Sequence, residues 1–356
     1  GLKFLSTQRA KSAEQKAYEQ QVMVIQDLMD RAGGALIYRD EPQARTLYQQ
    51  ATSLLHELPD NLPEREMKIK KFTLDIETAM DELRHIVHVP NPALLGDLTS
   101  SSPDISGSKF IRFNAELFVT GTDRNLYRLD QTLKVFKVAN TSPITTNEII
   151  SISEDDKQLY LLDSANLLFA FDASKNTSVP VSAPLEEGRW KSLVTYANRL
   201  YLLQGSPDGS DSQIIRANKS GEGFGAGQSW ITSKTTSLNQ AVSFILDGSL
   251  YVLKSSGQVI RFQNGSEVGW TIGLVDPPVT QATDIWTDPD STFFYLLEPK
   301  NKRLIVYKKE TGAFLVQYQS DAFDNLKGFA VDEKNYTIYL LSGSKLYSIA
   351  ASHLRN

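Results

Sequence analysis

The chain has 356 residues, with 37 lysine and arginine residues, 42 aspartate and glutamate residues, and no cysteine. A chain of this length forms two domains, or one large β domain with an appendage. The lack of cysteine excludes disulfide frameworks, thiolate zinc sites, iron–sulfur clusters and cysteine nucleophiles. The net charge of −5 argues against a broad nucleic-acid-binding surface, because such surfaces are basic.

No segment reaches the run of about 18 apolar residues that a membrane helix needs, and the N-terminus lacks the apolar core of a signal peptide. Because the chain starts at Gly1, we interpret it as a processed form or a piece of a longer protein. A membrane anchor would then lie in a segment that this chain lacks. The lack of cysteine favours an extracytoplasmic or cell-surface location, and a cytoplasmic one is the alternative.

Residues 1–90 have the pattern of helices. Apolar residues recur every three or four positions, which predicts helices over about 8–38, 41–57 and 63–87. Asp40, Glu41 and Pro42 supply an N-cap, an early acidic charge and a proline for the first turn of the second helix. Three amphipathic helices separated by short turns must bury their apolar faces against each other, as a hairpin or an antiparallel bundle.

The second helix has a more specific pattern. The spacing of Ala44, Tyr48 and Ala51 resembles the second helix of a tetratricopeptide-type hairpin, although the sequence contains no second copy of it. The resemblance implies a helical hairpin of that general shape. Separately, we expect the helical segments to act as a spacer, a docking unit or a site of self-association.

From residue 91 to 356 the pattern becomes β, with short apolar runs separated by polar turns. One short apolar motif centred on an aromatic residue recurs six times, with steps of 42, 41, 50, 44 and 44 residues between the aromatic positions. Its aromatic residues are Phe118, Tyr160, Tyr201, Tyr251, Tyr295 and Tyr339. This period is typical of one four-stranded propeller blade, so the sequence predicts a six-bladed β-propeller after an N-terminal helical region.

The last repeat lacks its outermost strand. The segment 93–98 precedes the first repeat and has the length of a strand, so we expect it to pair with the last blade. Joining the two ends of the domain in this way removes a pair of exposed sheet edges.

Repeats five and six also resemble a known family. Their successive segments are Asn301–Tyr307, Thr311–Phe314, Leu326–Asp332 and Ile338–Leu341. In this order they resemble the NHL repeat, whereas repeats one to four share only its strand pattern. The resemblance implies a six-bladed ring that presents a platform for ligands, proteins or RNA. NHL domains serve as bacterial extracellular sensors, as eukaryotic scaffolds and, in one branch, as metal-dependent lyases.

Catalytic and metal-binding signals are absent from the sequence. None of the four histidines falls on a predicted inner strand, where a propeller enzyme holds its metal, so we predict no metal and no cofactor. The acidic clusters around Asp155, Asp208 and Asp288 lack the spacing of a calcium loop and are interpreted as turn formers. Glu148 and Asp284 remain the best candidates for an acid–base pair across the channel, which is the least favoured interpretation.

The first strand of each blade lines the channel, and its start reaches one face of the ring. The charged and aromatic residues at these starts are the candidate binding residues: Arg112, Glu148, Trp190, Lys191, Asp284, Trp286 and Lys327. A rim of mixed charge with two tryptophans suits a protein loop or a small polar ligand. The opposing interpretation is that the charges are solvated and the tryptophans pack between blades.

The sequence as a whole predicts a non-enzymatic recognition or sensor module. We expect it to be the soluble part of a larger membrane-anchored signalling protein, with an intracellular protein-interaction scaffold as the alternative. A nucleic-acid partner is not expected, because residues 1–90 carry 12 basic and 14 acidic residues and the remainder is also acidic.

Overall fold

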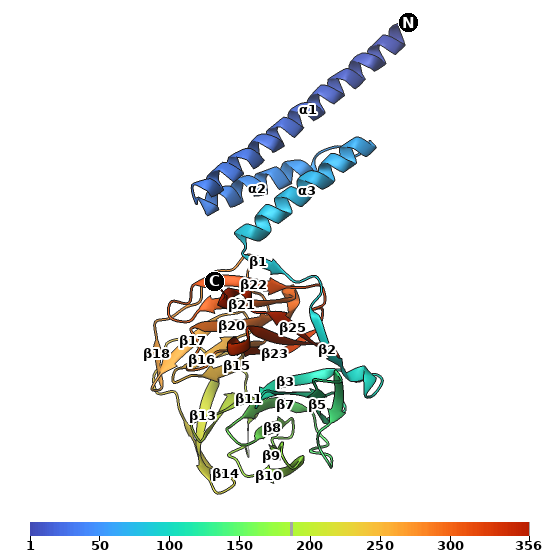
Figure 1. Cartoon of the computed structure of the whole chain (residues 1–356). Coiled ribbons are helices and arrows are strands. Elements are labelled where there is room, and N and C mark those ends of the chain that lie inside the picture. The colour runs from blue at the N-terminus through green and yellow to red at the C-terminus, as the bar shows by residue number, and fades with distance from the viewer. Residues whose placement is uncertain (186–187, 356) are drawn as a thin grey trace. The chain divides into compact units, whose positions relative to one another are not determined.

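The protein is described by a computed structural model that covers residues 1–185 and 188–355. The chain divides into two compact units, Gly1–Ile86 and Val87–Asn356. The first is helical and the second is built from strands, as the colours of Figure 1 show along the chain. Among the described helices, none is long and apolar enough to cross a membrane.

The helical unit contains α1 (Leu2–Ile37), α2 (Glu41–His56) and α3 (Pro63–Leu83). The Asp40 side chain accepts a hydrogen bond from the Gln43 N–H, which caps the start of α2 as expected. Two predicted boundaries differ. The first helix begins at Leu2 rather than near residue 8, and the third ends at Leu83, because Ile86–His88 form strand β1 instead of a last helical turn.

The apolar faces of the three helices form one core. The buried face of α2 has the helical spacing that the sequence predicts, and consists of Ala44, Leu47, Tyr48, Ala51 and Leu55. Arg65, at the start of α3, is also buried, and its guanidinium donates to Glu14, Gln15 and Asn61. It also lies 4.3 Å from the centre of the Tyr18 ring, so it ties α1 to α3.

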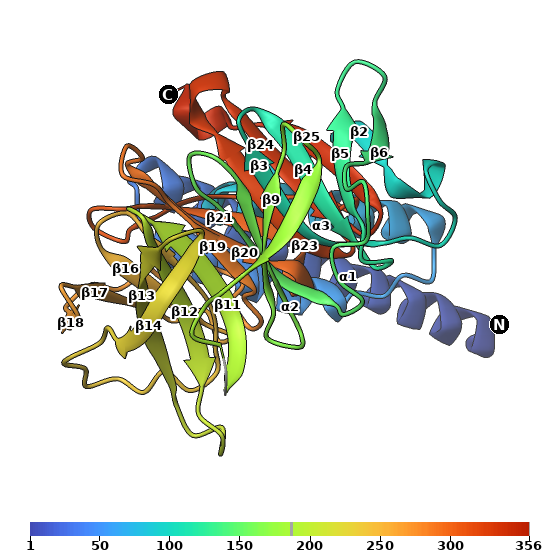
Figure 2. The same ribbon diagram turned by 90° about the horizontal axis from the view of Figure 1, so that it is seen from below.

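The strands of the second unit form six antiparallel sheets, the blades of a six-bladed β-propeller. Blade 1 comprises β3 (Gly107–Phe113), β4 (Glu116–Gly121), β5 (Leu126–Asp130) and β6 (Val135–Val138). Blade 2 comprises β7 (Ile149–Glu154), β8 (Leu159–Asp163), β9 (Leu168–Asp172) and β10 (Thr177–Val181). Blade 3 comprises β11 (Arg189–Tyr196), β12 (Arg199–Gly205), β13 (Ser212–Ser220) and β14 (Gly223–Ser229), which lie side by side in this order in Figure 2.

Blade 4 comprises β15 (Ala241–Leu246), β16 (Leu250–Lys254), β17 (Val259–Gln263) and β18 (Ser266–Val268). Blade 5 comprises β19 (Asp284–Trp286), β20 (Phe293–Glu298), β21 (Arg303–Lys308) and β22 (Phe314–Gln319), with β1 (Ile86–His88) added beside β22. Blade 6 comprises β23 (Leu326–Asp332), β24 (Thr337–Ser342) and β25 (Lys345–Ala350), and its outermost strand is β2 (Ala93–Asp97).

The recurring motif lies in the second strand of each blade, and its side chains are almost all fully buried. Both faces of this strand are covered by neighbouring blades, which explains the continuous apolar runs. The ring closes where β2 pairs antiparallel with β25, from Ala93 opposite Ser348 to Asp97 opposite Lys345. Strand β2 thus completes blade 6, whereas β1 adds a fifth strand to blade 5.

Buried polar networks join the loops to the blades. The Glu298–Arg303 ion pair is fully buried, and Arg303 also donates to the Gln317 side chain and to the Pro277 carbonyl. His353, near the C-terminus, lies between the hydroxyl groups of Tyr295 and Tyr318, at 2.9 and 2.7 Å from its ring nitrogens. These contacts fix the segment around His353 onto blade 5.

Candidate functional site

The innermost strands of the six blades, β3, β7, β11, β15, β19 and β23, surround a central channel. Its cavity volume of about 520 Å³ lies in the range of small-molecule sites. The inner strands have no sheet partner on the channel side, so the channel wall combines backbone groups with side chains from all six blades.

The strand register places one residue of each blade in a common layer. In blades 1, 2, 3, 4 and 6 the inner strand carries a β-bulge near its start, and the layer residue follows this bulge. In all six blades the layer residue pairs with the same position of the recurring motif on the second strand. That position is two residues after the aromatic residue of the motif. The members are Lys109, Ser151, Ser192, Ser243, Asp284 and Gly328, which we call the polar layer.

Hydrogen bonds connect the polar layer between neighbouring blades. The Ser151 hydroxyl accepts from the Leu193 N–H, which satisfies a backbone donor on the free edge of β11. The Ser243 hydroxyl donates to the Asp284 carboxylate at 2.9 Å, and that carboxylate also accepts from the Ile285 N–H. Burial raises the pKa of Asp284, while these hydrogen bonds and the Lys109 charge act to lower it.

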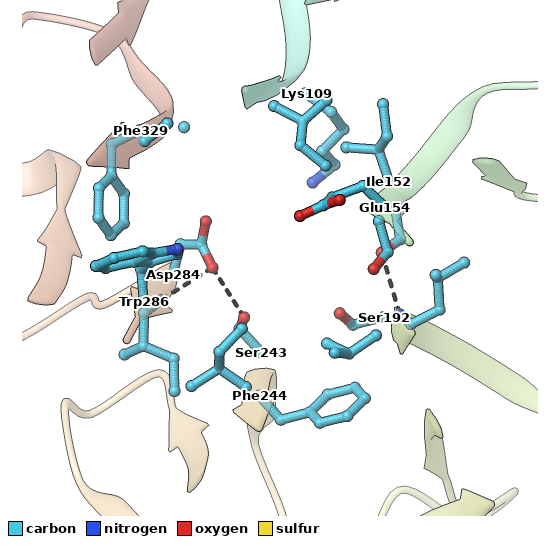
Figure 3. Close-up of a pocket in the computed structure, with 18 of the residues that line it drawn as sticks. Lys109, Ile152, Glu154, Ser192, Ser243, Phe244, Asp284, Trp286 and Phe329 are labelled. Atoms are coloured by element: carbon cyan, nitrogen blue, oxygen red, sulfur yellow. Dashed lines mark hydrogen bonds between the residues drawn. The ribbon is translucent and has the colours of Figure 1, made fainter. Parts of the chain in front are cut away.

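Aromatic side chains form part of the wall beside Asp284. Figure 3 shows the Trp286 ring next to Asp284, with Phe329 alongside it and Phe244 from blade 4 below. Trp286 packs edge-on against Tyr295, with ring centres 5.5 Å apart, which fixes its orientation. The channel therefore presents an apolar surface within reach of charged groups.

The ends of the inner strands carry a second set of charges. Arg112 pairs with the Asp332 carboxylate at 2.9 Å. Glu154, at the end of β7, projects into the channel (Figure 3) and is solvent-exposed, although the channel wall around it partly desolvates its carboxylate. This desolvation, together with the charges of Asp155 and Asp156, raises the pKa of Glu154 to about 7.

Of the residues predicted from the sequence, the structure brings five together in the channel wall. These are Arg112, Lys191, Asp284, Trp286 and Lys327. The Lys191 ammonium donates to the Ala241 carbonyl at 3.0 Å. Burial lowers the pKa of Lys191, and the nearby Arg189 charge lowers it further. Lys327 is exposed at the start of β23, whereas Asp284 and Trp286 are partly buried.

Trp190 and Glu148 do not belong to this wall. Trp190 is only 8% exposed and packs among the apolar residues between blades 2 and 3, as the opposing interpretation of the tryptophans stated. Glu148 precedes β7 and is exposed outside the channel lining. The structure therefore does not assemble an acid–base pair from Glu148 and Asp284, because Glu148 lies just before the strand that would have carried it into the channel.

The channel residues that the sequence analysis missed include Lys109, Glu154, Ser192 and Ser243. Glu154 was grouped with a turn, and the structure divides that group: Asp155 accepts the N–H groups of Lys157 and Gln158 as a turn former, whereas Glu154 faces the channel. The other three could have been found from their pairing with the recurring motif of the second strand. That pairing can be predicted only if the position of the β-bulge in the inner strand is known.

The other acidic positions form turns as expected. Asp208 accepts from the Ser210 N–H, and Asp288 accepts the N–H groups of Asp290 and Ser291. Within the described ranges, residues 1–185 and 188–355, no three histidine or acidic side chains converge as metal ligands do.

No protein-family model matches the chain, and no curated protein is detectably similar to it in sequence. Solved structures share its fold. The extracellular domain of the "putative hybrid two component system BT4673 from B. thetaiotaomicron" aligns with a TM-score of 0.51 at 11% identity, over 74% of this chain and 42% of that chain.

Two further structures align less well. A nidogen/laminin complex gives a TM-score of 0.48 at 11% identity, over 63% of this chain and 83% of that chain. The computationally designed Ika8 protein gives a TM-score of 0.42 at 10% identity, over 68% of this chain and 71% of that chain. At these identities the likeness concerns the fold alone, a β-propeller preceded here by helices.

Proposed function

We propose that this protein is a non-enzymatic recognition module whose propeller binds a small polar ligand in its central channel. The observation that carries this proposal is the polar layer inside a cavity of about 520 Å³, where a lysine, an aspartate and serine hydroxyls converge beside aromatic rings. Such a combination of an apolar wall with a few oriented polar groups is typical of ligand sites.

A filling substitution tests the location of the site. Ser192 is partly buried in the channel wall and makes no recorded side-chain hydrogen bond within the described part of the chain, so Ser192→Phe fills the channel without removing a contact. A matched control is Thr177→Phe on the outer strand of blade 2, where the side chain is exposed. A panel of polar metabolites and short peptides is screened by thermal shift, and hits are titrated by calorimetry.

We expect Ser192→Phe to weaken the binding of the selected ligand at least tenfold, and Thr177→Phe to leave it unchanged. Equal binding by both variants would show that the ligand lies outside the channel. A circular dichroism melt of each variant checks that the propeller remains folded.

We further propose that the chain is the extracytoplasmic part of a larger signalling protein and that the blades descend from NHL-like repeats. The lack of cysteine and the fold shared with the extracellular domain of a two-component system support the extracytoplasmic location. The order of the segments from Asn301 to Leu341 supports the NHL-like origin. Fractionation of the source cells, with an antibody against the propeller, tests it. A signal confined to the soluble cytosolic fraction would favour the intracellular scaffold instead.

A further inference from the structure

Within the described residues, the Asp284 carboxylate forms no ion pair with a cationic side chain. Its recorded partners are one hydroxyl, from Ser243, and the N–H of Ile285. Burial raises the pKa of Asp284 and the Lys109 charge acts against this rise, so the two groups interact electrostatically, although no ion pair joins them. A carboxylate withdrawn from water is stabilised by a cation, which this site lacks.

Lys109 is the complementary group across the layer. Its side chain projects into the channel from blade 1 (Figure 3), and within the described residues its ammonium has no recorded hydrogen bond or ion pair. Between blades 1 and 5 the layer position belongs to Gly328 of blade 6, which contributes no side chain. Lys109 and Asp284 therefore face the cavity as separated charges of opposite sign.

The remaining wall next to Asp284 is aromatic. Trp286 lies two residues further along β19, so it projects on the same side of the strand as Asp284. Phe329 of the next blade packs in the same cluster as Trp286. An aromatic ring beside a carboxylate attracts an ammonium group and also accommodates an apolar side chain.

We infer that the channel binds a small zwitterion, of which a free α-amino acid is the simplest representative. Its ammonium group lies against Asp284, its carboxylate against Lys109, and its side chain against Trp286 and Phe329. This inference rests on the proposed channel function and specifies its ligand class. A purely cationic or purely anionic ligand would leave one of the two charges uncompensated.

The test compares free amino acids with blocked forms that each lack one charge. The twenty free L-amino acids are titrated by calorimetry, and the tightest binder is compared with its N-acetyl derivative and its C-terminal amide. We expect the free form to bind at least tenfold more tightly than either blocked form, because each blocked form leaves the charge of Lys109 or of Asp284 uncompensated.

Two substitutions assign the charges. Lys109→Met should weaken the free amino acid at least tenfold and remove its advantage over the amide. Asp284→Asn, which keeps a hydrogen-bonding side chain for Ser243, should remove the advantage over the N-acetyl form. Matched controls are Lys137→Met and Asp130→Asn, which break an ion pair on the outer strands of blade 1 and should leave binding unchanged.

The outcomes separate this inference from the channel function itself. Equal binding of the free and blocked forms would overturn the inference that the ligand is a zwitterion. The absence of binding by any free amino acid at about 10 mM, the weakest affinity worth measuring, would overturn it as well. The channel function then still stands if another ligand of the screen is lost in Ser192→Phe. Free amino acids that bind equally well to Ser192→Phe would overturn both.

Discussion

The buried histidine near the C-terminus makes the stability of the propeller depend on pH. His353 is 8% exposed and lies between two tyrosine hydroxyls, and burial lowers its pKa from 6.5 to about 4. The folded protein therefore keeps this ring neutral at a pH where the unfolded chain binds a proton. The stability is full above pH 6.5 and is lost progressively as the pH falls toward about 4.

The size of this effect follows from the two pKa values. Each pH unit between them costs about 1.4 kcal/mol, so the free energy of unfolding falls by about 3 kcal/mol across the whole interval, and by somewhat less between pH 7 and pH 4.5. Glu154 acts in the opposite direction, because its raised pKa favours the folded state as it becomes protonated. A variant that alters only the histidine is therefore needed to isolate the effect.

The assay is urea unfolding at several pH values, for the wild type and for His353→Gln. All four tryptophans belong to the propeller, so their fluorescence reports the unfolding of that unit alone. At pH 7 the glutamine variant should be less stable, because it lacks the ring that spans Tyr295 and Tyr318. Toward pH 4.5 the difference should shrink by about 2–3 kcal/mol. Parallel curves at all pH values would refute the reasoning.

Three further predictions concern the packing. Glu298→Gln leaves Arg303 without its buried counter-ion and should lower the free energy of unfolding by about 3–5 kcal/mol in urea. In the helical unit, Arg65→Met should lower the thermal midpoint followed by circular dichroism at 222 nm (the helix band), whereas Lys70→Met, which breaks an exposed ion pair, should cost less than about 0.5 kcal/mol. Deletion of residues 1–98 removes β1 and β2, exposes the edges of blades 5 and 6 and should make the propeller aggregate, whereas deletion of residues 1–84 keeps both strands and should not cause aggregation in size-exclusion chromatography.

The architecture was predictable because it repeats. The recurring motif marks the second strand of every blade. Its spacing is that of one blade, and its six copies predict six blades. The end of α3 was less predictable, since Ile86 continues the helical spacing of Leu83 and yet belongs to β1. Pairing with β22 decides that conformation, and it involves residues more than 200 positions away.

The channel was predictable only in part, because β-bulges determine which side chain reaches it. Lys109 and Ser192 enter the polar layer one position later than an unbroken strand would place them. Trp190, just before the bulge of β11, is instead turned into the packing between blades. A sequence pattern shows that a strand is present, but a one-residue shift in its register exchanges the two faces.

The central claim, that the ligand binds inside the channel, is tested most directly by the tryptophan emission of the protein during a ligand titration. Trp286 is the only tryptophan in the described channel wall, since Trp190 is buried between blades and the other two lie in connections further out. We predict a saturable change in emission that Trp286→Phe abolishes while calorimetry still detects binding. An unchanged emission response in Trp286→Phe would contradict a channel site.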